Sequence, residues 1–315
     1  MFTQKEYVEI DGHEHGMIIE GTDKENPILL FVHGGPGFPE YPLMAAEKLA
    51  WLEDVTVCYW DQPGAGMSYN PKTQGELSID RYVKDCLAIT KHVKQQWKRE
   101  KIYLFGHSWG SMIACLTAYA HPEHFHALIT SGQMGRHRES TKDTLKFLER
   151  SAAVRGEHGV VKRVKKVKVD DTLHENADYR MLLGKVNKYG GGMKKSGYSN
   201  TNSLVDIMKC RAYTLRERMN ILPGAALTYK QVGKEMMDVD VAERTKRFEM
   251  PVYIMHGRYD YQTSLLEAER FFEKIDAPHK DFHVFENSAH TPFIEEQDKF
   301  IQLFQQILQN DGVTS

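Results

Sequence analysis

The stretch Lys101-Ile102-Tyr103-Leu104-Phe105-Gly106-His107-Ser108-Trp109-Gly110 decides the fold of this chain. Its first half is an apolar run with the branched and aromatic residues of a buried strand. Helix-forming residues follow from Ser111 to Ala120, and His121-Pro122 closes them. The turn between strand and helix has the pattern Gly-x-Ser-x-Gly. Glycine is needed on both sides because a Cβ there would collide with neighbouring backbone, and we expect Ser108 to adopt a strained conformation.

A strand, a tight turn and a helix around this pattern form the nucleophile elbow of an α/β-hydrolase. Outward from the elbow, the chain alternates apolar runs with helical segments, which predicts a mostly parallel sheet with helices on both faces. An N-terminal hairpin is expected over 7–20, around the turn Asp11-Gly12. The other expected strands are 28–32, 55–60, 102–105, 127–130, 252–255 and 281–285, and the expected helices are 41–52, 78–99, 109–121, 264–275 and 293–309.

This alternation stops between about residues 133 and 245, where the pattern is helical and charged. We predict an α/β-hydrolase core over 1–132 and 246–315, with a helical cap inserted over 133–245. The cap holds 23 Lys/Arg against 14 Asp/Glu, a net charge of +9. Its densest basic run, residues 162–168, has no interleaved aromatic residues and is interpreted as a solvated helix face. Gly190-Gly191-Gly192 predicts a flexible segment within the cap.

Composition narrows the function classes. A net charge of −2 over 315 residues gives no reason to expect nucleic acid. We see neither the apolar core of a signal peptide nor a stretch long enough to span a membrane, so a cytoplasmic protein is expected. The cysteines lie scattered without paired or metal-type spacing and are interpreted as reduced packing residues. No cofactor or metal site is predicted, and the sequence leaves the oligomeric state open.

A serine nucleophile needs a base within hydrogen-bond reach, and in this fold the acid and then the histidine follow it along the chain. Asp260 stands just beyond the strand at 252–255, and His290 stands on the loop after the strand at 281–285. We therefore predict the triad Ser108, Asp260 and His290, in which His290 takes the serine proton and Asp260 orients the imidazole. Asp276 and Glu286 are alternative acids.

Two backbone N–H groups are predicted to form the oxyanion hole. His33-Gly34-Gly35-Pro36-Gly37 directly follows a buried strand, and Gly35 is the first expected donor. The second is Trp109, at the start of the helix after the elbow, where the helix end adds partial positive charge. Whether Pro36 is cis stays open. The glycines of the later loop Asp61–Ser68 indicate a structural turn.

These three motifs together resemble the proline iminopeptidase family of α/β-hydrolases. The resemblance covers roughly residues 25–132 and 250–310. It implies a cytoplasmic serine aminopeptidase that releases an N-terminal proline, or another small residue, from short peptides without a cofactor.

The chain departs from the family pattern at two places. Pro63 stands where the family usually has arginine. The family's cap also supplies carboxylates, commonly near tryptophans, that bind the free amine of the substrate, whereas this cap has no tryptophan and is basic overall. Glu217 is the foremost candidate for that carboxylate. Weaker candidates are Glu175, Asp178, Asp206 and Glu243.

Three hypotheses follow. The first is a serine aminopeptidase of the proline iminopeptidase type. The second keeps the same triad but hydrolyses a small ester, lactone or amide, including an anionic one attracted by the basic cap. The third is a ligand-binding protein with a hydrolase fold and incidental turnover, since fold alone does not fix function.

Overall fold

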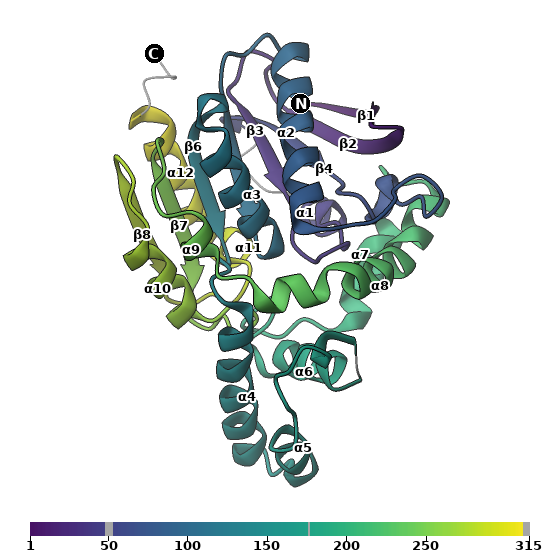
Figure 1. The fold of residues 1–315 in the computed structure, drawn as a ribbon, viewed down its shortest axis with the longest axis vertical. Helices are drawn as coiled ribbons and strands as arrows, with labels where there is room; N and C mark the ends of the chain where they lie inside the picture. The colour runs from purple at the N-terminus through teal and green to yellow at the C-terminus, as the bar shows by residue number, and fades with distance from the viewer. Residues whose placement is uncertain (48–52, 176, 311–315) are drawn as a thin grey trace.

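The computed structural model describes residues 1–47, 53–175 and 177–310, and it contains one eight-stranded sheet in the order β1-β2-β4-β3-β5-β6-β7-β8 (Figure 1). The first three strands in this order pair antiparallel, and the remaining neighbours pair parallel, as the sequence predicts. The strands are β1 (Phe2–Ile10), β2 (His13–Gly21), β3 (Ile28–Val32), β4 (Thr56–Trp60), β5 (Ile102–His107), β6 (Phe125–Ser131), β7 (Val252–Gly257) and β8 (Lys280–Phe285).

Each face of the sheet buries its own hydrophobic core, because successive side chains of a strand point to opposite faces. On one face, Ile28 and Leu30 pack with residues of α2 (Ile79–Gln96), α3 (Trp109–Ala120) and α10 (Leu265–Lys274). On the other face, Leu29 and Phe31 pack with residues of α1 (Tyr41–Glu47), α11 (Pro292–Glu295) and α12 (Gln297–Asn310). The sheet is therefore covered on both sides, as its nearly unbroken apolar strands require.

Element boundaries differ modestly from the sequence prediction. The helix expected over 41–52 corresponds to α1, and its last five positions lie outside the described residues. The helix expected over 293–309 is divided into α11 and α12 at Glu296. β5 and β7 each extend two residues beyond the predicted strand, because the residues of the following loop still pair with a neighbouring strand.

In the segment between β6 and β7, where the sequence predicts a cap, the described residues form six α-helices and a short 3-10 helix at Leu173–Glu175. Figure 1 shows α4, α5 and α6 projecting beyond the end of the sheet, with α7 and α8 to one side. The helices are α4 (His137–Val154), α5 (His158–Val164), α6 (Ala177–Tyr189), α7 (Asn200–Lys209), α8 (Leu215–Asp238) and α9 (Val241–Arg244). The basic run lies on α5 and the turn after it, with all five of its lysine and arginine side chains exposed. The division into core and cap remains a prediction.

The glycine run after α6 is not the free segment that the sequence predicts. The carbonyl of Gly191 accepts a hydrogen bond from the amide of Tyr261 at 2.9 Å, and the carbonyl of Gly192 accepts one from the amide of His290 at 3.0 Å. The neighbouring amide of Met193 donates to the side chain of Asn187 at 2.8 Å. This run therefore connects the helical segment to the loops after β7 and β8.

All four cysteines are buried and free, as expected for packing residues. Burial raises the pKa of each of their thiols, so the reactive thiolate is disfavoured. None of the described helices combines the length and the apolar character needed to cross a bilayer.

Candidate active site

Ser108 occupies the tight turn between β5 and α3 with backbone angles φ 55° and ψ −123°, the strained conformation that the sequence predicts. The turn packs against its surroundings without room for side chains at its glycines. A Cβ on Gly110 would lie 2.0 Å from the carbonyl oxygen of Val32, and one on Gly106 would lie 2.5 Å from the carbonyl oxygen of Gly110. These close approaches hold the turn against β3 and α3 and present Ser108 at the end of the sheet.

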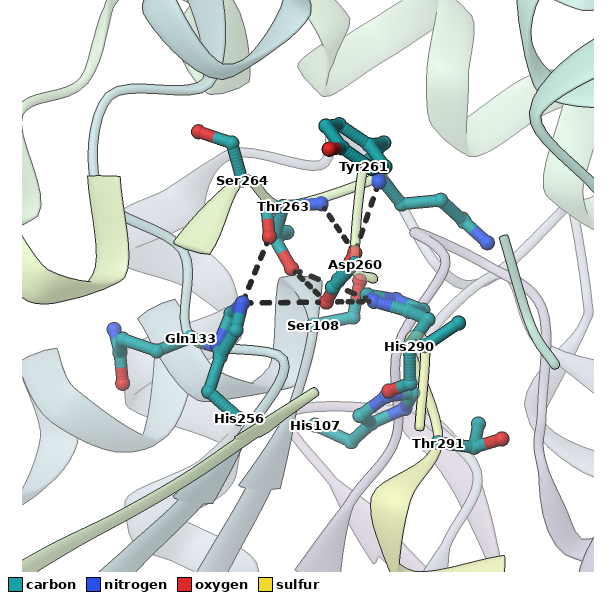
Figure 2. Close-up of polar contacts among 12 residues, drawn as sticks. His107, Ser108, Gln133, His256, Asp260, Tyr261, Thr263, Ser264, His290 and Thr291 are labelled. Carbon is teal, nitrogen blue, oxygen red and sulfur yellow. Dashed lines mark hydrogen bonds and ion pairs between the residues drawn. The ribbon is translucent and has the colours of Figure 1, made fainter. Parts of the chain in front are cut away.

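Asp260 and His290 meet beside Ser108 at the carboxyl end of the parallel strands. The imidazole Nδ1 of His290 donates to Oδ2 of Asp260 at 2.7 Å. Figure 2 shows the Ser108 side chain beside this imidazole, and Ser108 and His290 line the same cavity. The structure thus brings together the three residues of the predicted triad. The two alternative acids, Asp276 and Glu286, are exposed and pair with Arg247 and Arg258.

The carboxylate of Asp260 is fixed by several donors besides His290. The hydroxyl of Thr263 donates to Oδ2 at 2.8 Å, and the amides of Thr263 and Gln262 donate to Oδ1 at 3.0 and 2.9 Å (Figure 2). Burial alone would raise the pKa of Asp260, but the charge of His290 and the hydrogen bond from it dominate and lower the pKa to about 2. Asp260 is therefore ionised at neutral pH and favours the tautomer of His290 that carries its proton on Nδ1.

Gly35 and Trp109, the predicted oxyanion donors, belong to two different segments, the loop after β3 and the first turn of α3. Gly35 lines the cavity with φ 117°, and the Gly35–Pro36 peptide bond is cis. Trp109 is the first residue of α3, and the first N–H groups of a helix have no partner within the helix. Its indole is fully buried and donates to Oε1 of Gln62 at 2.9 Å, so the ring packs away from the cavity.

The loop after β4 supports the site structurally. Gln62 donates its side-chain amide to the carbonyl of His33 at 2.7 Å, and its backbone amide donates to Nε2 of the same histidine at 3.1 Å. Asp61 accepts hydrogen bonds from the Tyr213 hydroxyl at 2.6 and 2.7 Å and from the amide of Met67 at 2.8 Å. The loop thereby connects the glycine loop after β3, its own turn and the region before α8.

The cavity that contains Ser108 and His290 has a volume of about 250 Å³. Its walls include the loop after β3 and residues of α1, α6, α7 and α8. Much of the lining is apolar, including Phe38, Pro39, Leu43, Leu183, Met193 and Ile207. Two carboxylates also line it, Glu40 and Asp206, whereas none of its lining residues is a lysine or arginine. The positive charge of the helical segment therefore does not reach the cavity lining among the described residues.

Glu217, the foremost candidate for an amine-binding carboxylate, lies elsewhere. Its carboxylate accepts hydrogen bonds from Lys5 at 2.6 Å, from the hydroxyl of Tyr7 and from the amide of Thr214 at 2.6 Å. The last contact is half of a capping box at the start of α8. Glu217 is not among the residues that line the cavity, so the geometry gives no support for the predicted role.

Two other carboxylates line the cavity, which Glu217 does not reach. Asp206, named as a weaker candidate, lines the cavity from α7 and accepts a hydrogen bond from the hydroxyl of Tyr198. Glu40 was not predicted. Its place seven residues after His33, on the glycine loop that approaches Ser108, is the one feature of the sequence that could have indicated it. Among the described residues, no group of three or more His, Cys, Asp or Glu is arranged to hold a metal ion.

The sheet, its covering helices and the strained serine turn define an α/β-hydrolase fold, and solved structures support this class. A proline iminopeptidase of Mycobacterium smegmatis superposes with a TM-score of 0.68 at 17% identity, covering 99% of this chain and 100% of that one. Est816, described as an enzyme that degrades N-acyl homoserine lactones, superposes with a TM-score of 0.65 at 15% identity, covering 96% of this chain and 99% of that one. At these identities the likeness concerns the fold alone.

Sequence comparison identifies the family. The pattern of the serine aminopeptidase family S33 matches residues 24–297, so the chain belongs to this family of serine hydrolases. A probable aminopeptidase of Bacillus subtilis, YbaC, is 24% identical over 285 residues, covering 90% of this chain and 89% of the relative. The predicted resemblance to the proline iminopeptidase family is thereby confirmed at the level of the family.

Proposed function

We propose that this protein is a serine aminopeptidase that releases proline or another small N-terminal residue from short peptides. The observation that carries the proposal is the cavity beside Ser108, which is lined by two carboxylates and by no lysine or arginine among the described residues. The free amine of a peptide is cationic at neutral pH, and burying it requires a nearby carboxylate to offset its desolvation.

In the proposed reaction, the Ser108 hydroxyl attacks the carbonyl carbon of the first peptide bond while Nε2 of His290 takes its proton. Negative charge develops on the carbonyl oxygen and is stabilised by the N–H groups of Gly35 and Trp109. The imidazolium then protonates the leaving amine, the C–N bond breaks, and an acyl-enzyme remains. Water, deprotonated by His290, attacks this ester; the imidazolium then returns the proton to the Ser108 oxygen as the C–O bond breaks and the amino acid is released. Asp260 stabilises the imidazolium in both halves of the cycle.

We assign amine recognition to Asp206. Asp206 lines the same cavity as Ser108 but comes from α7, so different elements would hold a substrate amine and supply the Ser108 hydroxyl. Asp206 is half-buried, and among the described residues only its Oδ2 accepts a hydrogen bond, from the hydroxyl of Tyr198. The volume of about 250 Å³ suits one small residue rather than a long chain.

The apolar part of the lining favours a second candidate function, the hydrolysis of a small ester or lactone by the same three residues. An uncharged acyl group would pack against Leu43, Leu183 and Ile207 without using Asp206. An anionic substrate is disfavoured, because the carboxylate of Asp206 in the cavity lining would repel it.

Kinetics with matched substrates would separate these functions. We expect proline, alanine and leucine arylamides to be cleaved, and N-acetylated versions of the same arylamides to be cleaved far more slowly. Rapid cleavage of short acyl esters with no arylamide release would favour the esterase. Ser108→Ala should lower turnover by about 10⁴- to 10⁶-fold. Turnover of wild-type rate in that variant would reject the mechanism, and ligand binding without turnover in the wild type would favour the binding protein.

A further inference from the structure

His107, the residue just before Ser108, connects two segments of the site through its imidazole. The ring is fully buried. Its Nδ1 lies 2.5 Å from Oε1 of Glu40, and its Nε2 lies 2.8 Å from the carbonyl oxygen of His290. The rings of His107 and His290 are also in contact, with centroids 4.6 Å apart. One side chain therefore joins the loop after β3, the serine turn and the loop that carries His290.

The partners of His107 determine its charge. A carbonyl oxygen can only accept a hydrogen bond, so Nε2 must carry a proton. The other nitrogen faces a carboxylate, and imidazole is about two pKa units more basic than a glutamate side chain, so the proton between them stays on Nδ1. His107 is then an imidazolium paired with ionised Glu40. Burial alone would lower the pKa of His107, but the charge and hydrogen bond of Glu40 dominate and raise it.

His33 provides an internal comparison, because it is buried in the same region with a different set of partners. Its Nδ1 donates to the carbonyl of Gly34 at 2.7 Å, and its Nε2 accepts from the amide of Gln62 at 3.1 Å. One donor and one acceptor position suit a neutral ring, and burial lowers the pKa of His33 to about 4. Two buried histidines near one serine are thus expected to carry different charges.

We propose that Glu40 and His107 are positioning residues, whose charge pair holds the backbone of His290 so that its imidazole stays aligned with Ser108. The proposal rests on the proposed function, since it takes His290 as the base. A Cβ on Gly34 would lie 3.0 Å from both Oε1 of Glu40 and Cβ of Ser108, so those two atoms are within about 6 Å of each other. The pair is therefore next to the reacting groups.

The pair makes the alignment depend on the protonation of His107. When pH rises through the pKa of His107, the ring loses one of its two N–H groups and can no longer donate to both partners. We therefore expect activity to fall on the basic side of the pH profile, at the pKa of His107. The titratable groups whose charges reach His107 are His33, Glu40, His256 and Asp260, and the ring of His290 also lies against it.

The test is the rate at which a fluorophosphonate labels Ser108, measured against pH, because this probe needs an activated serine but no natural substrate. Glu40→Gln keeps an acceptor for Nδ1 but removes the charge, so the basic midpoint should move down by about 1 to 3 pH units. Glu40→Asp retains the charge and should restore part of the shift. Glu123→Gln is the matched control, since Glu123 pairs with His124 on the surface. An unchanged midpoint in folded Glu40→Gln would overturn the proposal.

A second measurement uses the wild-type protein and does not depend on a variant that folds. Nitrogen-15 NMR of labelled histidine should show His107 with protons on both ring nitrogens at pH 7 and His33 with one. A neutral His107 at pH 7 would overturn the proposal. Failure of the proposed function would be distinguishable, because the wild type would then release no arylamide, while the labelling profile and the NMR result would still report the charge of His107.

Discussion

The imidazole Nδ1 of His290 lies 2.7 Å from Oδ2 of Asp260, a residue 30 positions earlier in the chain. The distance follows from the sheet. β7 and β8 pair in parallel up to Gly257 and Phe285, so the loops that follow them leave the sheet side by side. Each loop needs only a few residues to bring its polar side chain to the same point.

We expect Asp260→Asn to lower kcat/KM by about 10⁴-fold, because an amide that donates to Nδ1 would stabilise the wrong tautomer of His290. Arylamide hydrolysis and fluorophosphonate labelling would both measure the loss. Asp276→Asn and Glu286→Gln are the matched controls, since both carboxylates are exposed and pair with arginines. If either control lost activity as severely as Asp260→Asn, the assignment of the acid would be wrong.

Asp206→Asn should raise KM for a proline arylamide by about 10- to 100-fold, because the variant loses one hydrogen bond to the charged amine. The change in kcat should be smaller. Hydrolysis of an acyl ester without an amine should be unaffected. Glu217→Gln is the comparison, because Glu217 is tied to Lys5 and the start of α8 rather than to the cavity. A KM increase in Glu217→Gln and none in Asp206→Asn would reverse the assignment.

Asp61 predicts a pH dependence of stability. Burial raises its pKa to about 7, above the value near 3.9 of an unfolded chain. Its stabilising contribution is therefore complete below about pH 4 and is lost as pH rises through 7. The free energy of unfolding of Asp61→Asn, relative to the wild type, should increase by about 2 to 3 kcal/mol from pH 5 to pH 8. Urea unfolding at the two pH values measures this difference, and a constant difference would contradict the raised pKa.

Gly110→Ala should cost about 3 kcal/mol or more of folding stability, because its Cβ would meet backbone atoms of Val32 and His33 that cannot move separately from β3. Gly184→Ala is the contrasting variant. Gly184 lies within α6 with no atom within 4 Å of an added Cβ, so alanine should stabilise by about 0.5 to 1 kcal/mol. Denaturant midpoints would test both. Equal changes in stability for the two variants would show that a lack of space around Gly110 is not the reason why glycine is needed there.

The parts of the fold that depend on local pattern could be predicted from the sequence. Apolar runs located the strands that follow the hairpin, and the glycines around Ser108 indicated the serine turn. Asp260 and His290 could also be predicted from the sequence, because each follows a strand and the two come after the serine in the chain order of this fold. The family comparison agrees with the resemblance carried by the glycine loop and the serine turn.

The contacts made by individual carboxylates could not be predicted in the same way. Glu217 and Asp206 both lie on helices of the predicted cap, and only the packing of α7 and α8 decides that Asp206 faces the cavity. Glu40 meets His107 across 67 positions of sequence, which no periodic pattern encodes. The glycine run at 190–192 was misinterpreted for a related reason, since its partners lie on distant loops.

The hydrogen bonds of the glycine run at 190–192 restrict how a substrate can enter the cavity. The carbonyl of Gly192 holds the amide of His290, and the carbonyl of Gly191 holds the amide that follows Asp260. A swing of this segment away from the sheet would pull on the two loops that align the base and the acid, and the enzyme would lose its alignment each time it opened. If the alignment of the base and the acid is to be kept, substrate and product must therefore enter and leave along another wall of the cavity, such as the one formed by α1 and α7.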